Sequence, residues 1–389
     1  MSSAAPASGA SIVPFRIAVS AAELEDLQRR LATVRWPPEA PGAGWEDGVP
    51  LGYLRELAEY WRTTYDWRRH EARLNSFAQF TTEIDGARVH FLHVRSAEPD
   101  ALPLVVTHGW PGSIAEFIDV IGPLADPRAH GGDPGDAFHV VAPSIPGYGF
   151  SGPTRAPGWD VARVARAWAE LMSRLGYQRY GAQGGDWGSA VSQQLARVAA
   201  GRIVGLHLNL LMTAQPAAGP GPADLSGADR RAAQSLIEFR TWRSGYQLVN
   251  ATQSQTLAYA LTDSPVGQLA WIVDKMMEWS AARHAPEEAV DRDLILTNVM
   301  LYWLTRTAGS SARLYKTLTS AQPPATRIEA PTAVAVFPSD IARPVPAWAQ
   351  QQANVVRWTE FEHGGHFAAL EAPNPLVHDI RAFFRQLRR

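Results

Sequence analysis

The sequence RYGAQGGDWGS, residues 179–189, decides the fold. It begins as a short strand-like run and continues into a helical pattern, with glycines two positions before and two positions after Asp186. This is the layout of a nucleophile elbow, a sharp turn from strand to helix that exposes one side chain, with aspartate where serine often stands. A Gly-x-Asp-x-Gly match alone is weak, because Gly-Asp turns are common. The rest of the chain has to support it.

Short, continuous apolar runs alternate with helical patterns from Leu102 onward, which is typical of buried parallel strands in βαβ units. The runs are PLVVT, FHVVAP, RYGAQGG, IVGLHLNL, PTAVAVFP and VVRWTEF. Residues 221–326 carry helical patterns such as PVGQLAWIVDKMMEWS without a convincing strand. The Pro/Gly-rich residues 219–227 are the expected hinge at the entry to this segment. We predict an α/β fold with a mostly parallel sheet and helices on both faces, in which a helical cap (221–326) separates two core segments (101–220 and 327–389).

The chain before the core predicts an α-plus-hairpin extension over residues 12–100, preceded by a disordered Ala/Ser-rich tail over residues 1–11. Ser20 and Glu23 have the spacing of a capping box at the start of an amphipathic helix. Asp85-Gly86 separates two strand-like runs, FAQFTTEI and ARVHFLHV, which indicates a hairpin.

Composition excludes several classes of protein. Hydrophobic residues make up 46% of the 389 residues and charged residues 19%, which is typical of a globular chain with a large core. A formal net charge of −2 gives no basic surface for nucleic acid or an anionic membrane. With no cysteine, no signal-peptide pattern and no long apolar run, we expect a soluble, cytoplasmic protein without a membrane partner.

A catalytic acid and base follow the elbow in the expected order. Asp340 ends the strand-like run PTAVAVFP, and His366 lies in HGGHFAAL, just after VVRWTEF. Nucleophile, acid, base is the chain order of the α/β-hydrolase fold. His363 is a rival base three residues earlier, but His366 has the position that this fold normally uses. We predict a triad of Asp186, Asp340 and His366.

The segment HGWPG, residues 108–112, directly follows the first strong parallel strand. An α/β hydrolase places its second oxyanion donor there, so the backbone N–H groups of Trp110 and Trp187 are the candidate oxyanion hole. His108 is expected to shape this loop rather than to act as a base.

An aspartate nucleophile favours alkyl transfer over acyl transfer. A carboxylate that attacks a saturated carbon forms an ester, which water can later cleave, whereas a serine would form an unreactive ether. Epoxides and alkyl halides are then the leading substrates. An epoxide oxygen needs a hydrogen-bond donor as its C–O bond breaks, and a protonated tyrosine supplies one.

From about Ile12 to its end, the chain resembles the microsomal-type epoxide hydrolase family. Besides the N-terminal extension, the blocks HGWPGS, PSIPGYGFSG, GGDWGS, DSPVGQLAWI, NVMLYW and GGHFAALE occur in that family's order. The resemblance implies that two cap tyrosines, Tyr246 in SGYQLVNAT and Tyr315 in SSARLYK, bind the epoxide oxygen and that Asp340 is the acid. It also implies an epoxide substrate and a possible homodimer, and the 14 tryptophans favour a small hydrophobic epoxide.

Several alternatives stay open. Tyr246 and Tyr315 also fit aromatic packing in the cap, and Tyr259 and Tyr302 compete with them on similar patterns. A haloalkane or haloacid dehalogenase would share the triad and use the Trp187 indole; a non-catalytic binding protein and an ester hydrolase fit less well. Asp263 is expected to cap a helix. The sequence shows no clustered metal ligands and no phosphate-binding glycine motif, so no metal or cofactor is expected.

Overall fold

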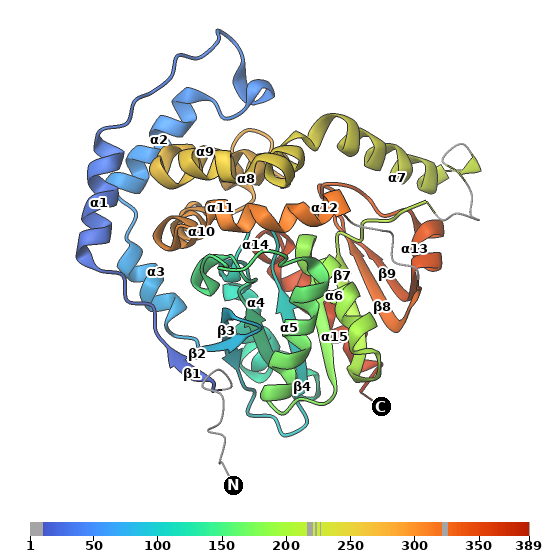
Figure 1. Cartoon of the computed structure of the whole chain (residues 1–389). Helices are drawn as coiled ribbons and strands as arrows, with labels where there is room; N and C mark the ends of the chain where they lie inside the picture. The colour runs from blue at the N-terminus through green and yellow to red at the C-terminus, as the bar shows by residue number, and fades with distance from the viewer. Residues whose placement is uncertain (1–10, 216–220, 222–223, 226, 321–325, 389) are drawn as a thin grey trace.

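The computed structural model describes residues 11–215, 221, 224–225, 227–320 and 326–388. The predicted tail, except residue 11, and much of the predicted hinge (219–227) therefore lie outside the described residues. In the described part a nine-stranded sheet forms the centre of the molecule. Figure 1 shows this sheet below a layer of helices.

The sheet has the order β1-β2-β3-β5-β4-β6-β7-β8-β9, and the strands from β5 to β9 in that order are parallel. The strands are β1 (Val13–Phe15), β2 (Gln79–Ile84), β3 (Ala87–Val94), β4 (Leu102–Thr107), β5 (Phe138–Pro143), β6 (Tyr180–Gly184), β7 (Ile203–Asn209), β8 (Ile328–Val336) and β9 (Ala353–Glu360). All six predicted parallel strands are confirmed, as is the β2–β3 hairpin. Strand β1 was not predicted, because three residues are too short to show an alternation.

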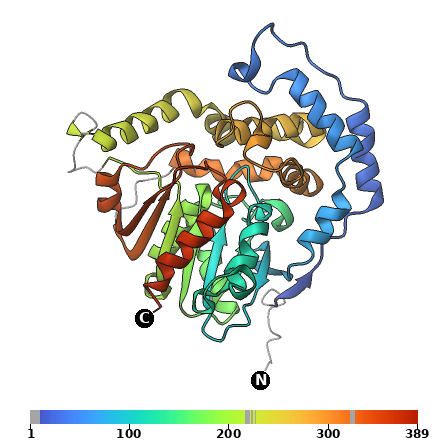
Figure 2. The ribbon, with the colours of Figure 1, turned by 180° about the vertical axis from the view of Figure 1, so that it is seen from behind.

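Helices cover both faces of the sheet, which confirms the predicted α/β-hydrolase architecture. Figures 1 and 2, seen from opposite sides, show α5 (Val161–Arg174) and α6 (Asp186–Val198) in front of one face and α4 (Ile118–Ala125) and α15 (Pro373–Arg385) in front of the other. The buried side of α5 includes Val164, Trp168, Leu171 and Met172, at helical spacing, so the helix packs its apolar stripe on the sheet.

The segment between β7 and β8 lies over the carboxyl ends of the parallel strands (Figure 1). Where the structure describes it, this segment is helical: α7 (Gly227–Glu238), α8 (Gly245–Asp263), α9 (Pro265–Glu278), α10 (Arg292–Thr305), α11 (Ala308–Ala312) and α12 (Thr317–Ser320). Two short helices, α13 (Pro346–Gln352) and α14 (Ala368–Glu371), belong to the core after β8. Ligands of α/β sheets bind at the carboxyl ends of the strands, so the cap covers the expected site.

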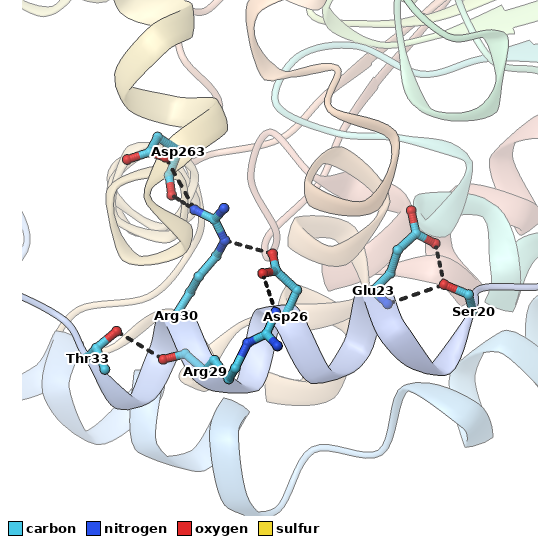
Figure 3. A network of polar contacts seen from close by, with 7 residues as sticks. All are labelled: Ser20, Glu23, Asp26, Arg29, Arg30, Thr33 and Asp263. Carbon is cyan, nitrogen blue, oxygen red and sulfur yellow. Dashed lines mark hydrogen bonds and ion pairs between the residues drawn. The ribbon is translucent and has the colours of Figure 1, made fainter.

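The N-terminal extension packs against the cap through α1 (Ala21–Ala32), α2 (Leu51–Thr63) and α3 (Trp67–Leu74). The predicted capping box is present, since the Ser20 hydroxyl accepts a hydrogen bond from the Glu23 N–H at 3.2 Å. Figure 3 shows how α1 reaches the end of α8, where Arg30 donates to the backbone oxygen of Asp263 at 2.8 Å.

The prediction that Asp263 caps a helix is wrong. Asp263 is the last residue of α8, and the N-cap of α9 is Ser264, whose hydroxyl accepts from the Gly267 N–H at 3.0 Å. An N-cap residue needs an extended backbone, which Ser264 has (φ −106°, ψ 111°). The Asp263 carboxylate instead pairs with Arg30 on the surface.

Candidate active site

Asp186 stands at the turn between β6 and α6, at a backbone φ of +49°. Residues with side chains rarely adopt this left-handed region, although aspartate tolerates it better than most. A Cβ atom at Gly184 would lie 2.2 Å from the backbone oxygen of Gly188, and one at Gly188 would lie 1.9 Å from that of Thr107. Both glycines are therefore needed for the close approach that holds the elbow.

The loop after β4 brings backbone donors to the Asp186 carboxylate. The Trp110 N–H donates to Asp186 Oδ1 at 2.8 Å, and the Trp187 N–H also bonds the carboxylate. The two predicted oxyanion donors thus converge on one side chain. Two residues four apart on α10 hold this loop: Asn298 Nδ2 donates to the Pro111 oxygen, and the Tyr302 hydroxyl to the Gly112 oxygen, both at 2.7 Å.

His366 lies between the two carboxylates of the predicted triad. Its Nδ1 is 2.8 Å from Asp340 Oδ1, and its Nε2 is 3.6 Å from Asp186 Oδ2. Asp340 Oδ1 also accepts the backbone N–H of Ile341 at 2.7 Å, which fixes the carboxylate. The structure therefore brings the three residues together from three separate loops.

The charges of the residues in the predicted triad depend on one another. Burial opposes a charge on His366, but Asp340, by its charge and its hydrogen bond, and Asp186 outweigh burial and raise the pKa of His366 to about 9. Burial also raises the pKa of Asp186, against the pull of His366 and the two backbone N–H groups. At neutral pH His366 is therefore an imidazolium, whose charge opposes the effect of burial on the Asp186 pKa.

The two other histidines weighed as bases lie elsewhere in the structure. His108 is buried, its Nδ1 is 2.9 Å from the Gly109 oxygen, and its Nε2 accepts the Ile145 N–H at 3.2 Å. Burial lowers the pKa of His108 to about 4, so it is a neutral bridge between two loops. His363 is exposed.

Tyr246 and Tyr315 belong to the cap and lie on the side of the elbow that faces the cap. The Tyr246 ring stacks on Trp110 at a centroid distance of 5.4 Å, and the Tyr315 ring meets Trp187 edge-on at 4.9 Å. The centroids of the two tyrosine rings are 5.8 Å apart. Burial raises the pKa of both hydroxyls, so both are protonated donors at neutral pH. Among the described residues, none forms a hydrogen bond of normal geometry with the Tyr315 hydroxyl.

The competing tyrosines have other places. Tyr259 is 72% exposed on α8. The Tyr302 hydroxyl is occupied by the Gly112 oxygen, as described above.

Sequence reasoning missed several residues around the triad. The Trp279 ring packs edge-on against His366 at 5.1 Å, and its backbone oxygen accepts the His366 N–H at 2.8 Å. The Glu371 carboxylate accepts the N–H groups of Phe367 and Ala281, and so joins the His366 loop to the cap. Single aromatic or acidic residues form no pattern of their own, so the sequence carries no signal for the roles of Trp279 and Glu371. Asn298 and Tyr302 do carry a signal, since they are spaced four apart in an apolar helix.

Within the described ranges, no three histidine, aspartate or glutamate side chains group as metal ligands. Nor is any helix there both long and apolar enough to span a bilayer.

Comparison with known proteins agrees with this geometry. Residues 12–117 match the family described as the epoxide hydrolase N terminus, and residues 103–373 match the α/β hydrolase fold. Epoxide hydrolase 1 of Sus scrofa is 35% identical, over 97% of this chain and 90% of its own length. A Stigmatella aurantiaca protein, provisionally named an epoxide hydrolase, is 48% identical over 97% of this chain and 86% of its own.

The solved structure of the Aspergillus niger epoxide hydrolase superposes with a TM-score of 0.87, at 33% identity and 97% coverage of both chains. Two family matches together span the chain from residue 12 to residue 373, and the extension, the core and their order agree. The chain therefore belongs to the microsomal-type epoxide hydrolase family of the α/β-hydrolase fold.

Proposed function

We propose that this epoxide hydrolase converts an epoxide and water to a vicinal diol through a covalent ester on Asp186. The observation that carries the proposal is the position of the Asp186 carboxylate. It accepts two backbone N–H groups, lies 3.6 Å from His366 and faces two protonated tyrosines.

In the first half-reaction, an Asp186 oxygen attacks a ring carbon and the C–O bond of the epoxide breaks. Tyr246 and Tyr315 donate hydrogen bonds to the oxygen as it becomes negative, which is where preorganised donors act most strongly. The proton that this oxygen finally takes is the one on His366. Its loss is favoured because the ester has removed the Asp186 charge that helped to hold it.

In the second half-reaction, neutral His366 removes a proton from water, which attacks the ester carbonyl carbon. Asp340 holds His366 in the tautomer with a proton on Nδ1 and stabilises the imidazolium that forms. The N–H groups of Trp110 and Trp187 bind the oxyanion of the tetrahedral intermediate. Release of the diol restores the Asp186 carboxylate and the His366 imidazolium, so charge and protons balance over the cycle.

The walls of the site favour a hydrophobic substrate. The rings of Trp110, Trp187, Trp279 and the two tyrosines pack against one another beside the elbow. Such walls offer apolar contacts and few further hydrogen bonds, so we expect epoxides with aryl or alkyl substituents to be preferred.

Diol formation from styrene oxide, a terminal aliphatic epoxide and an internal epoxide tests the proposal, with haloalkanes alongside. Asp186→Asn is the matched control, because asparagine tolerates the left-handed backbone at this position. We expect diol from wild type, none above background from the variant, and no halide release. Halide release without diol would establish a dehalogenase instead.

A further inference from the structure

A small polar chamber lies beside the Asp186 carboxylate. It offers about 20 Å³ to the centre of a water molecule, which is room for about one water. Polar side chains line it from several elements, including Glu116, Gln183, Asn209, Asp186 and His366. A water in this chamber has the nucleophile's carboxyl group and the candidate base as neighbours.

Glu116 is the titratable group in this wall that the proposed mechanism does not use. It belongs to the short 3₁₀ helix Ile114–Phe117, directly after the loop of residues 108–112 that carries the Trp110 N–H and is called the oxyanion loop below. A Cβ atom at Gly112 would lie 1.5 Å from Glu116 Oε1, so the carboxyl group lies against the backbone of that loop. Position 112 has to be glycine for Glu116 to reach the chamber.

Burial raises the pKa of Glu116 to about 8, with opposing effects of His366 and Asp186. A negative charge on Glu116 would also raise the pKa of Tyr302, which belongs to the overlying α10. At neutral pH Glu116 is therefore a carboxylic acid, which has one O–H donor and can still accept hydrogen bonds.

Glu116 also has a structural use, since its carboxyl group bonds the Ser113 N–H in the manner of a capping box. That bond uses one oxygen of the carboxyl group. A capping box does not require a buried acid, because a glutamine closes it equally well. The experiment therefore has to distinguish the loss of the capping box from the loss of a bound water.

We propose that this chamber holds the hydrolytic water and that Glu116 is the residue that positions it for His366. The carboxylic acid accepts a hydrogen bond from the water, or donates one to it, while His366 Nε2 takes the proton. The neutral form matters because an anion at this place would raise the pKa of His366 and repel the oxyanion that follows. This inference rests on the ester mechanism proposed above.

The two half-reactions of Glu116→Leu, Glu116→Gln and wild type are measured separately. Enzyme is mixed with styrene oxide and quenched at intervals, and intact mass spectrometry of each sample gives the rates at which the ester forms and decays. We expect Glu116→Leu to form the ester within about 3-fold of the wild-type rate and to hydrolyse it on the order of 100-fold more slowly, as for a misplaced reactant. Glu116→Gln keeps the capping box and can still form a hydrogen bond with the water, so the rate at which it hydrolyses the ester at pH 7 should stay within about 5-fold of wild type.

A pH series and a structural control complete the experiment. As the pH rises through the ionisation of Glu116, ester decay should slow in wild type and stay level in Glu116→Gln. Ser113→Ala removes the hydroxyl that caps the same turn through the Ala115 N–H and that donates to Asn298 Oδ1. Because Glu116 is intact in this variant, it should lower the melting temperature and still show the slowing of ester decay at high pH that wild type shows.

Wild-type decay in Glu116→Leu, equal slowing of both steps, or a Glu116→Gln enzyme as slow as Glu116→Leu would each overturn the positioning role. If no variant and no wild-type sample forms an ester, the ester mechanism itself fails. The two failures are therefore distinguishable.

Discussion

Replacing His366 with glutamine should stop the reaction halfway. Loss of the general base should slow ester hydrolysis by a factor on the order of 10² to 10⁴. Attack on the epoxide needs the Asp186 carboxylate and the tyrosine donors, and in the variant the solvent supplies the proton that the opened oxygen takes from His366 in wild type. Intact mass spectrometry of His366→Gln mixed with epoxide should show an adduct with the mass of one substrate molecule, and peptide mapping should place it on Asp186.

The rate at which this adduct forms should depend on pH in a defined direction. His366 Nε2 and Asp186 Oδ2 are 3.6 Å apart, so at an effective dielectric constant of about 20 the imidazolium stabilises the carboxylate by about 5 kcal/mol at most. Burial already raises the pKa of Asp186, and the variant loses the opposing charge. Adduct formation in His366→Gln should therefore accelerate as the pH rises.

Oxygen isotopes give an independent check on the same step. Because water attacks the ester carbonyl carbon, one turnover of wild type in oxygen-18 water should give mostly unlabelled diol and leave the label in Asp186. Labelled diol in the first turnover, together with no adduct in His366→Gln, would refute the reasoning, since water would then attack the epoxide directly.

Three further predictions concern the donors, the metal requirement and stability. Tyr315→Phe or Tyr246→Phe should each slow ester formation by something on the order of 10- to 1,000-fold, and the double variant should nearly abolish it; a wild-type rate in Tyr315→Phe would assign that residue to packing. Activity should survive exhaustive chelation, and a loss restored only by a divalent ion would contradict the triad mechanism. Asp379 is buried and bonds His207 at 3.0 Å and Arg357 at 2.8 Å, so Asp379→Asn should cost about 3–5 kcal/mol of unfolding free energy. These partners hold its pKa below the ordinary 3.8, so this stabilisation is present above about pH 4 and is lost at lower pH; an equal gap between the two melting temperatures at pH 3 and pH 7 would count against it.

Local patterns were enough to predict most of the framework. The six apolar runs became parallel strands because a strand buried on both faces needs a continuous run of apolar residues. The capping box at Ser20 and the turn at Asp85-Gly86 formed because their interactions span only a few residues. For the same reason the elbow around Asp186 is visible as two glycines at fixed spacing.

Family resemblance supplied what local patterns do not. Tyr246 and Tyr315 look like packing residues by periodicity alone, and only the surrounding blocks singled them out. Their positions above Trp110 and Trp187 come from the cap's packing on the core.

Tertiary structure alone decided the electrostatic and steric details of the site. Glu116, Trp279 and Glu371 come from distant parts of the chain and meet around His366. The pKa of a carboxyl group depends on burial and on charges a few ångströms away, neither of which is a property of its sequence neighbours. The sequence therefore determined the fold and predicted the nucleophile and the order of the triad, whereas three-dimensional packing determined the surroundings of these groups and left room for a water beside them.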